Sequence, residues 1–254
     1  MRSHPLTSLL AAQNLGYLGA GSQMLGIDGE DGLLAACWAG SNIVPVGSGE
    51  AIEPFSAFLR KRGRRASSIV GDADLVLPMW SLLETTWGPA RDVRGNQPCL
   101  VIRARSAMEP DRRVRRAEAA DVDLLLPASI AMFKEEVGYD PTRAGSGYNQ
   151  YVRSLVSNGR AYIVIDRIDG REAVVFKADI GALWDGVAQV QGVWVHPDLR
   201  GKGFGTAAVA AVVADILTFA PTVSLYVNWY NTGARRVYEK VGFEQEATYA
   251  TILL

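Results

Sequence analysis

The second half of the chain alternates between strand-like and helix-like patterns of apolar residues. Runs rich in β-branched and aromatic residues predict strands, and they cover residues 161–180, 187–197, 222–228 and 244–254. The first run is two strands joined at Asp169-Gly170, a dipeptide typical of tight hairpins. Apolar residues at helical spacing predict helices, and they cover residues 121–138, 148–159, 205–220 and 231–243. Residues 113–121 form a strand that runs into the first helix, and Pro127 is a potential break in that helix.

The first half carries a similar but weaker pattern. It predicts strands at residues 22–28, 32–40, 67–71 and 97–104, and helices at residues 51–62 and 72–88. This order echoes the order of the second half, although no motif repeats, so an internal duplication is suspected. A small, polar stretch with Pro110 favours a boundary near residues 105–112. We therefore expect two units, residues 1–108 and residues 112–254.

Composition narrows the classes of function. Of the 254 residues, 48% are hydrophobic and 21% are charged, which predicts a substantial core. The net charge of −1 favours neither nucleic acid nor an anionic membrane as a partner. No apolar run is long enough to span a membrane, and "MRSHPLTSLL" lacks a full signal-peptide pattern. Cys37 and Cys99 lie in apolar runs and are expected to be buried thiols. Together these features indicate a cytoplasmic protein.

One short stretch, "HPDLRGKGFGTAAV" at residues 196–209, is typical of an anion site. It is not a P-loop, because Lys202 is followed by Gly203 rather than by Ser or Thr. It is not a dinucleotide fingerprint, because Thr206 stands where a third spaced glycine is needed. It has the form R-x-x-G-x-G, set between a predicted strand and an apolar helix. Free N–H groups and the dipole of that helix favour an anion such as a pyrophosphate. The alternative is a tight turn whose glycines serve packing.

A second motif follows about two dozen residues later, in "LYVNWYNTGARRVYEKVGF". It has the form N-x-x-A-x-x-x-Y-x-x-x-G-F, beginning at Asn231 and containing Tyr238. With the first motif, it makes residues 112–254 resemble the GNAT superfamily of acyl-CoA-dependent N-acyltransferases. The whole chain is more loosely similar to two-domain GNAT proteins whose N-terminal half is a degenerate domain without a cofactor loop. The resemblance implies an α+β fold, with a mixed, mostly antiparallel central sheet, flanking helices and two GNAT-like halves in tandem.

The resemblance also implies a co-substrate, acetyl-CoA, and no metal. The residues implied to bind it are Val193, Val195, Arg200, Gly201, Lys202, Gly203, Phe204, Gly205, Thr206, Asn231 and Tyr238. Backbone amides of the glycine loop would hold the pyrophosphate, and the strand through Val193 and Val195 would pair with the pantetheine arm. A splay between this strand and the next would admit the thioester. The N–H near Val193 would act as an oxyanion donor, and Tyr238 would protonate the leaving thiolate. Tyr238 also lies on an apolar helix face, so a core role is the alternative.

The general base does not follow from the family pattern. Many relatives place a glutamate on the strand before the glycine loop, but this strand offers Ala188, Gln189 and Gln191. Glu135 and Glu136, at the end of the first helix, are the base candidates. Asp140 and Asp185 are further carboxylates nearby, and each of these four groups could simply be a solvated surface charge. His196 is expected to be an exposed residue at a strand end, and His4 to be uninvolved.

The function implied is transfer of an acetyl group to a primary amine by direct attack, with a small molecule or a peptide as acceptor. An aromatic acceptor cleft is suggested by Tyr139, Tyr148, Tyr151, Trp184, Trp194, Trp229 and Tyr230, with packing between the halves as the alternative. Two other functions stay open: a non-catalytic acyl-CoA-binding sensor or scaffold, and a tandem-GNAT acyltransferase acting on an amino-sugar thiol precursor. The sequence leaves the acceptor, the acyl-chain preference and the oligomeric state open.

Overall fold

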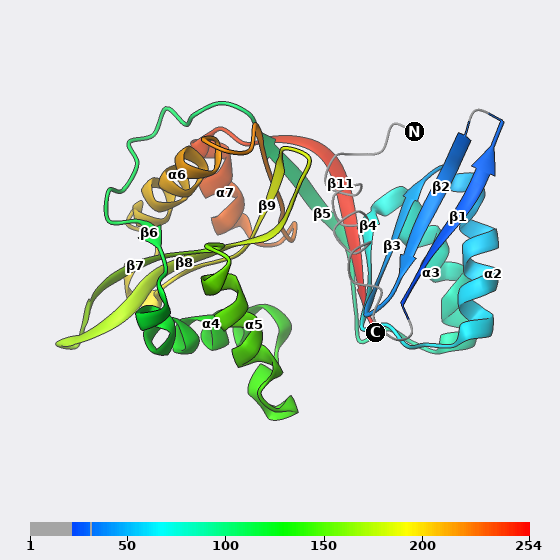
Figure 1. Ribbon diagram of the computed structural model, residues 1–254, viewed down its shortest axis with the longest axis horizontal. Helices are drawn as coiled ribbons and strands as arrows, with labels where there is room; N and C mark the ends of the chain where they lie inside the picture. Colours follow the sequence, from blue (N-terminus) through cyan, green and yellow to red (C-terminus); the bar gives the residue numbers. More distant parts are fainter. Residues whose placement is uncertain (1–21, 31) are drawn as a thin grey trace.

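A computed structural model describes residues 22–30 and 32–254, which form one eleven-stranded sheet flanked by six α-helices (Figure 1). The strands are β1 (Gln23–Gly29), β2 (Gly32–Ala39), β3 (Asn42–Gly47), β4 (Ser68–Asp72), β5 (Asp92–Ile102), β6 (Arg115–Arg116), β7 (Ala161–Ile168), β8 (Arg171–Trp184), β9 (Val187–Val195), β10 (Thr222–Tyr226) and β11 (Glu244–Leu253). The α-helices are α2 (Ile52–Arg62), α3 (Ala73–Trp87), α4 (Val122–Val137), α5 (Gly147–Ser157), α6 (Phe204–Ile216) and α7 (Thr232–Val241). Short 3₁₀ helices are η1 (Gly49–Ala51), η2 (Ala119–Asp121), η3 (Pro141–Ala144) and η4 (Pro197–Leu199).

The sheet is mixed and mostly antiparallel, as expected. Its order is β1-β2-β3-β4-β11-β5-β10-β9-β8-β7-β6. Two neighbouring pairs are parallel, β3 with β4 and β9 with β10. Each pair is joined through a helix, α2 or α6, and each is followed by a second helix and an antiparallel strand. The two halves therefore repeat the same unit of strand, helix, parallel strand, helix and strand, which confirms the expected tandem arrangement.

The two halves exchange their last strands. β5 closes the N-terminal half in sequence, yet it pairs with β10 of the C-terminal half, for example through Leu100 and Leu225. β11 closes the C-terminal half in sequence, yet it pairs with β4 of the N-terminal half, for example through Ile252 and Ile69. β5 and β11 also pair with each other, and these long strands run between the halves in Figure 1. The division into residues 1–108 and 112–254 stays a prediction, and the sheet shows that a strand crosses it in each direction.

The hydrophobic cores follow this exchange. In the C-terminal half, α6 and α7 cover one face of the sheet while α4 and α5 lie on the other (Figure 1). The core under α6 includes Leu100 and Ile102 from β5. In the N-terminal half, α2 and α3 pack over a core that includes Ala250 and Ile252 from β11. Each core therefore contains side chains that the other half supplies, and burial of such apolar surface is the main favourable term in folding.

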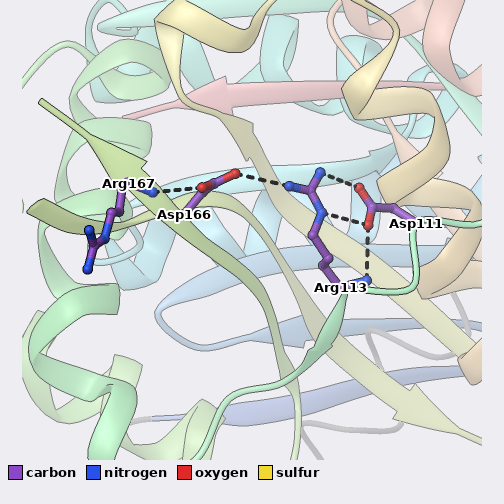
Figure 2. Close-up of polar contacts among 4 residues, drawn as sticks. All are labelled: Asp111, Arg113, Asp166 and Arg167. Carbon is purple, nitrogen blue, oxygen red and sulfur yellow. Dashed lines mark hydrogen bonds and ion pairs between the residues drawn. The ribbon is translucent and has the colours of Figure 1, made fainter. Parts of the chain in front are cut away.

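The segment between β5 and β6 is held against the second half. The guanidinium of Arg113 lies between two carboxylates, 2.8 Å from Asp111 Oδ2 and 3.0 Å from Asp166 Oδ2 (Figure 2). It also lies 5.3 Å above the ring of Phe204, the first residue of α6. The N–H of Asp111 donates to the carbonyl of Ala207, one turn further along α6. The linker therefore packs beside the start of this helix.

Three local features differ from the sequence prediction or sharpen it. β3 was missed, because Pro45 and Gly47 within it are typical of loops. Pro127 does not break α4: the carbonyl left without a partner belongs to the exposed Asp123 in the first turn, where water can satisfy it. The Asp169-Gly170 hairpin is confirmed, and both residues have positive φ, 50° and 77°, as a tight hairpin turn requires.

Both cysteines are buried free thiols, as predicted. Burial raises the pKa of Cys37 and of Cys99 to about 12. Across residues 22–30 and 32–254, no helix is long and apolar enough to cross a membrane.

Candidate functional site

A cavity of about 240 Å³ lies where the parallel strands β9 and β10 separate. The two strands pair over only three positions, ending at Ser224 opposite Gln189. Beyond that point, residues 190–193 and 225–228 form opposite walls of the cavity. The resemblance implied this splay. The remaining wall residues are Gln97 from β5, Met132, Glu135 and Glu136 from α4, and Tyr230, Asn231, Ala234 and Tyr238 around α7.

The glycine loop lies between β9 and α6. Gly201 and Gly203 have φ values of 75° and 81°, a region that glycine adopts without steric cost. Gly203 is the N-cap of α6, and it has no side chain to satisfy the first amides of the helix. In the described part of the chain, no protein acceptor is found for the N–H groups of residues 201–205. Free amides at the positive end of a helix are suited to an anion.

Arg200 ties the glycine loop to the neighbouring elements. Its Nη2 lies 2.8 Å and 3.1 Å from the two carboxylate oxygens of Glu135, and its Nε donates to the carbonyl of Val195 at 2.9 Å. The indole N–H of Trp194 also donates to Glu135, at 3.1 Å. Lys202 instead donates to the carbonyl of Asp198 at 2.8 Å, within the loop. The side chains of Arg200 and Lys202 therefore both stabilise the loop through hydrogen bonds to nearby residues of the protein.

β9 contains a bulge where it faces the cavity. Its pairing with β8 steps from Gln191, opposite Asp179, to Trp194, opposite Lys177. Gly192 and Val193 belong to neither the pairing with β8 nor the pairing with β10. Gly192 has a φ of 57°, and β-bulges with a glycine in this conformation are a known way to re-aim a strand. The peptide group between Gly192 and Val193 is therefore outside the sheet ladder and beside the cavity.

Tyr238 belongs both to the core and to the cavity wall. Its side chain is 6% exposed and packs edge-on against Phe243, with ring centroids 5.8 Å apart. Burial, and to a smaller extent the charge of Glu136, raises the pKa of Tyr238, so the phenol is protonated at neutral pH. Among the described residues, its hydroxyl has no hydrogen-bond partner. The two alternatives from the sequence are therefore compatible: the ring is packed, and the hydroxyl is available to a ligand.

The two glutamates of α4 differ in their surroundings. Both carboxylate oxygens of Glu135 accept from Arg200. The carboxylate of Glu136 is about half exposed and lies 3.9 Å from the guanidinium of Arg94, which also donates to the Glu136 carbonyl at 2.7 Å. Glu136 thus keeps lone pairs for a ligand, whereas those of Glu135 are largely engaged. Asn231 caps α7, because its side-chain oxygen accepts from the N–H of Ala234 at 3.1 Å.

The N-terminal half contributes to this site through β5. The side chain of Gln97 is 3% exposed, donates to Asn228 Oδ1 at 2.9 Å and accepts from Thr251 Oγ1 at 2.7 Å. Sequence reasoning missed Gln97, Tyr226 and Asn228 as cavity residues. The available signal for Gln97 was a polar residue at the start of an apolar strand. That signal does not show that Gln97 reaches the cavity, because its position there depends on the strand exchange.

Other residues considered from the sequence lie elsewhere. Asp140 pairs with Lys134 at 2.7 Å, and His196 packs edge-on against Trp194. Asp185 is a turn residue with a φ of 48°, and His4 lies outside the described residues. Of the seven aromatic residues suggested for an acceptor cleft, Tyr230 lines the cavity. Tyr139, Tyr148 and Phe133 instead form an edge-to-face row at the end of α4. No group of three His, Cys, Asp or Glu side chains suited to a metal ion is present in the described ranges.

Two family models each match a part of the chain. Residues 178–252 match the family described as FR47-like protein, and residues 22–125 match a domain of unknown function, DUF4081. No curated protein matches the chain. A GNAT-family acetyltransferase from Colwellia psychrerythraea has a similar structure, with a TM-score of 0.59 and 13% identity, over 99% of this chain and 98% of its own.

Two further structures share the fold along most of the chain. A GCN5-related N-acetyltransferase from Sphaerobacter thermophilus has a TM-score of 0.61 and 15% identity, over 97% of this chain and 90% of its own. A tandem GNAT protein from the clavulanic acid biosynthesis pathway has a TM-score of 0.54 and 12% identity, over 96% of this chain and 86% of its own. These likenesses bear out the resemblance at the level of the fold: the chain has the GNAT fold in two halves.

Proposed function

We propose that this protein is an N-acetyltransferase that transfers the acetyl group of acetyl-CoA to a primary amine. The observation that carries this proposal is the combination of three features around β9. The bulge at Gly192 and the side chain of Tyr238 line the gap between β9 and β10, and the free amides of the glycine loop follow between the end of β9 and α6. These features fit a thioester whose pyrophosphate lies at the loop and whose acyl end lies in the cavity.

Each end of the co-substrate has partners in this proposal. Free backbone amides of residues 201–205 hold the pyrophosphate, supported by the positive end of α6. The N–H groups of Arg200 and Thr206, expected from the sequence to take part, instead donate to the carbonyls of Pro197 and Gly203. The pantetheine arm lies along Val193 and Val195, in place of the pairing that β10 gives up after Gln189. Asn231, at the start of α7, contacts the arm from the other wall. Gly205 lets α6 approach closely, since a Cβ there would lie 3.3 Å from Val195 Cγ2.

The acceptor side of the cavity favours a cation. Its wall contains the carboxylates of Glu135 and Glu136, with amides from Gln97 and Asn228, and no lysine or arginine among the described lining residues. An alkyl or peptide amine is largely protonated at neutral pH, so a carboxylate wall attracts it. Glu136 is the better placed base candidate, because Glu135 is engaged by Arg200. It accepts the proton that the ammonium must lose before attack, directly or through a water molecule.

The transfer itself then needs three groups. The neutral amine nitrogen attacks the thioester carbonyl carbon, and the backbone N–H of Val193 stabilises the negative charge that develops on the carbonyl oxygen. The C–S bond breaks, and Tyr238 gives its proton to the leaving sulfur. After attack the nitrogen is positively charged and loses a second proton, which replaces the one given up by Tyr238, while the first proton passes from Glu136 to solvent. One amide and one CoA thiol are formed. Positioning of amine and thioester in one cavity supplies the rest of the acceleration.

The experiment is a panel of amines presented with acetyl-CoA, with release of free thiol as the measurement. The panel contains aromatic amines, peptide N-termini and an amino-sugar thiol precursor, which the tandem arrangement favours as a second candidate acceptor. Thiol release that depends on one amine class supports the proposal. Tight CoA binding without turnover of any amine would instead support the acyl-CoA sensor. The buried free thiols suit a reducing compartment such as the cytoplasm, where acetyl-CoA is available.

A further inference from the structure

Two opposite charges lie buried beneath the bulge of β9. Lys177 and Asp179 are two residues apart on β8, so their side chains share one face of the strand. Lys177 is 1% exposed and Asp179 is 4% exposed. Charged residues are rarely buried so completely unless they are paired, and a buried pair is weak evidence for a purely stabilising role. We therefore looked for a functional role of this ion pair in its contacts with β9.

The contacts of Lys177 connect this pair to Gly192. The ammonium Nζ lies 2.5 Å from Asp179 Oδ2 and donates to the backbone carbonyl of Gly192 at 3.1 Å. A Cβ on Gly192 would lie 2.8 Å from Asp179 Oδ2 and 2.9 Å from Lys177 Nζ. The ion pair is thus packed directly against the bulge, at the one residue whose φ of 57° re-aims the strand.

The geometry of the peptide bond gives this contact a consequence for the cavity. The carbonyl of Gly192 and the N–H of Val193 belong to the same planar, trans peptide group, so they point in opposite directions. An ammonium that holds the carbonyl on the β8 side therefore directs the N–H away from β8, toward the gap before β10. A cation on the carbonyl also polarises the peptide group, which makes its N–H a stronger donor.

We propose that Lys177, held in place by Asp179, is a positioning residue that aims and polarises the Val193 N–H toward the thioester carbonyl. The inference rests on the proposed function, since it requires acetyl-CoA in the cavity. Asp179 neutralises the ammonium and restricts it to one orientation. The pair then acts on the acyl group through one peptide bond, without touching the substrate.

The test compares the binding of acetyl-CoA and of CoA, which differ only in the acyl group. If the Val193 N–H bonds the acyl carbonyl, wild-type protein should bind acetyl-CoA about fivefold more tightly than CoA, the effect of about one hydrogen bond. The double variant Lys177→Met/Asp179→Leu replaces the pair with apolar side chains of similar volume, a change that folded proteins often tolerate. In this variant the acetyl-CoA to CoA affinity ratio should fall to about one, with the Kd for CoA unchanged.

Two controls separate positioning from stability. Asp179→Asn removes the charge that neutralises Lys177 but keeps an oxygen acceptor for it, so it should lower the Tm and, with Lys177 still donating to the Gly192 carbonyl, retain the ratio. Val175→Ala removes buried methyl groups from the same strand away from the bulge, so it should lower the Tm and leave the ratio unchanged. If the double variant shows no cooperative melting, Lys177→Met alone gives the same comparison, because Asp179 can then take up a proton.

The outcomes distinguish the two proposals. A lost ratio with CoA affinity retained supports the role of Lys177. A retained ratio in the folded variant, or an equal loss of affinity for both ligands, overturns that role while the acetyltransferase proposal stands. Absence of CoA binding by the wild-type protein would overturn both. The infrared band of the bound thioester carbonyl provides a second readout, since it should move back toward the free value only in variants that lack Lys177.

Discussion

The junction between β9 and α6 and the junction between β3 and α2 hold equivalent positions in the two halves, yet only the first is suited to an anion. The first is a loop with glycines at positive φ and free amides. The second is short, and η1 follows at once, with Glu50 in its first turn and the hydroxyl of Ser48 accepting from the Glu50 N–H at 3.3 Å. A carboxylate and a capping hydroxyl there take the place that a pyrophosphate would need.

The strand gaps beside these junctions differ as well. β9 and β10 separate around the cavity, whereas in the N-terminal half a Cβ on Gly71 of β4 would lie 3.5 Å from the carbonyl of Pro45 on β3. The same strand–helix–strand unit therefore has separated parallel strands in the C-terminal half and closely packed parallel strands in the N-terminal half. The N-terminal half contributes instead through β5, whose Gln97 lines the cavity of its neighbour. The N-terminal half thus supplies part of the wall of the cavity in the C-terminal half.

The largest effect should come from separating the halves. Segments 1–108 and 112–254, produced alone, should each fail to melt cooperatively, because each lacks a central strand of its sheet. Cys99 and Val101 of β5 are almost fully buried, so their removal opens the core of the C-terminal half. Circular dichroism and chromatography measure this, and production of both segments together should restore a folded complex. A C-terminal segment that folds and binds CoA alone would contradict the importance of the exchange.

A smaller but more specific effect is expected for Tyr238→Phe. The ring and its packing remain, and the hydroxyl has no hydrogen bond to a described residue to lose, so the free energy of unfolding should change by less than about 1 kcal/mol. Turnover with an identified amine should fall by about 10² to 10⁴, the usual contribution of a positioned acid, while the Kd for acetyl-CoA stays the same. Steady-state kinetics and a thermal melt on the same preparation measure both. Near-normal turnover would restrict Tyr238 to its core role.

The smallest effect is expected on acetyl-CoA affinity, in a pair of variants that compares the two junctions directly. Gly203→Asp places a side chain and a negative charge at the start of α6, where φ is 81°, and should weaken acetyl-CoA binding at least about tenfold, or about 1.4 kcal/mol. The comparison variant Gly49→Asp adds the same charge at the start of the N-terminal helix pair, at a residue without a positive φ, and should leave binding unaltered. Calorimetry on both variants is the measurement. Equal losses would mean that both halves take part in binding the co-substrate.

The parts of this molecule that depend on local pattern could be predicted from the sequence. The hairpin at Asp169-Gly170 and the glycine loop before α6 are encoded by residues that need special backbone angles. Tyr238 and Asn231 were implied as site residues by the family resemblance of one spaced motif, and both line the cavity. The residues that make up each of these features are neighbours in the sequence, so one short stretch is enough to predict each feature.

The parts that depend on distant pairing could not be predicted. Gln97 reaches the cavity only because β5 pairs with β10, more than a hundred residues later in the chain. Nothing adjacent to Lys177 and Asp179 in the sequence indicates the bulge that they support, so their burial could not be predicted. Arg200 was expected to act through its backbone, and its side-chain contact with Glu135 required the packing of α4.

The exchanged strands also bear on how the chain folds during synthesis. The N-terminal half lacks its own central partner for β4 until β11 has left the ribosome, since Ile69 pairs with Ile252 at the far end of the chain. Contacts this distant in sequence close slowly, and an unpaired β4 edge is open to wrong partners in the meantime. We therefore expect the nascent N-terminal half to stay incomplete until β11 is available, and a ribosome stalled with β11 still in its tunnel should hold a protease-sensitive intermediate.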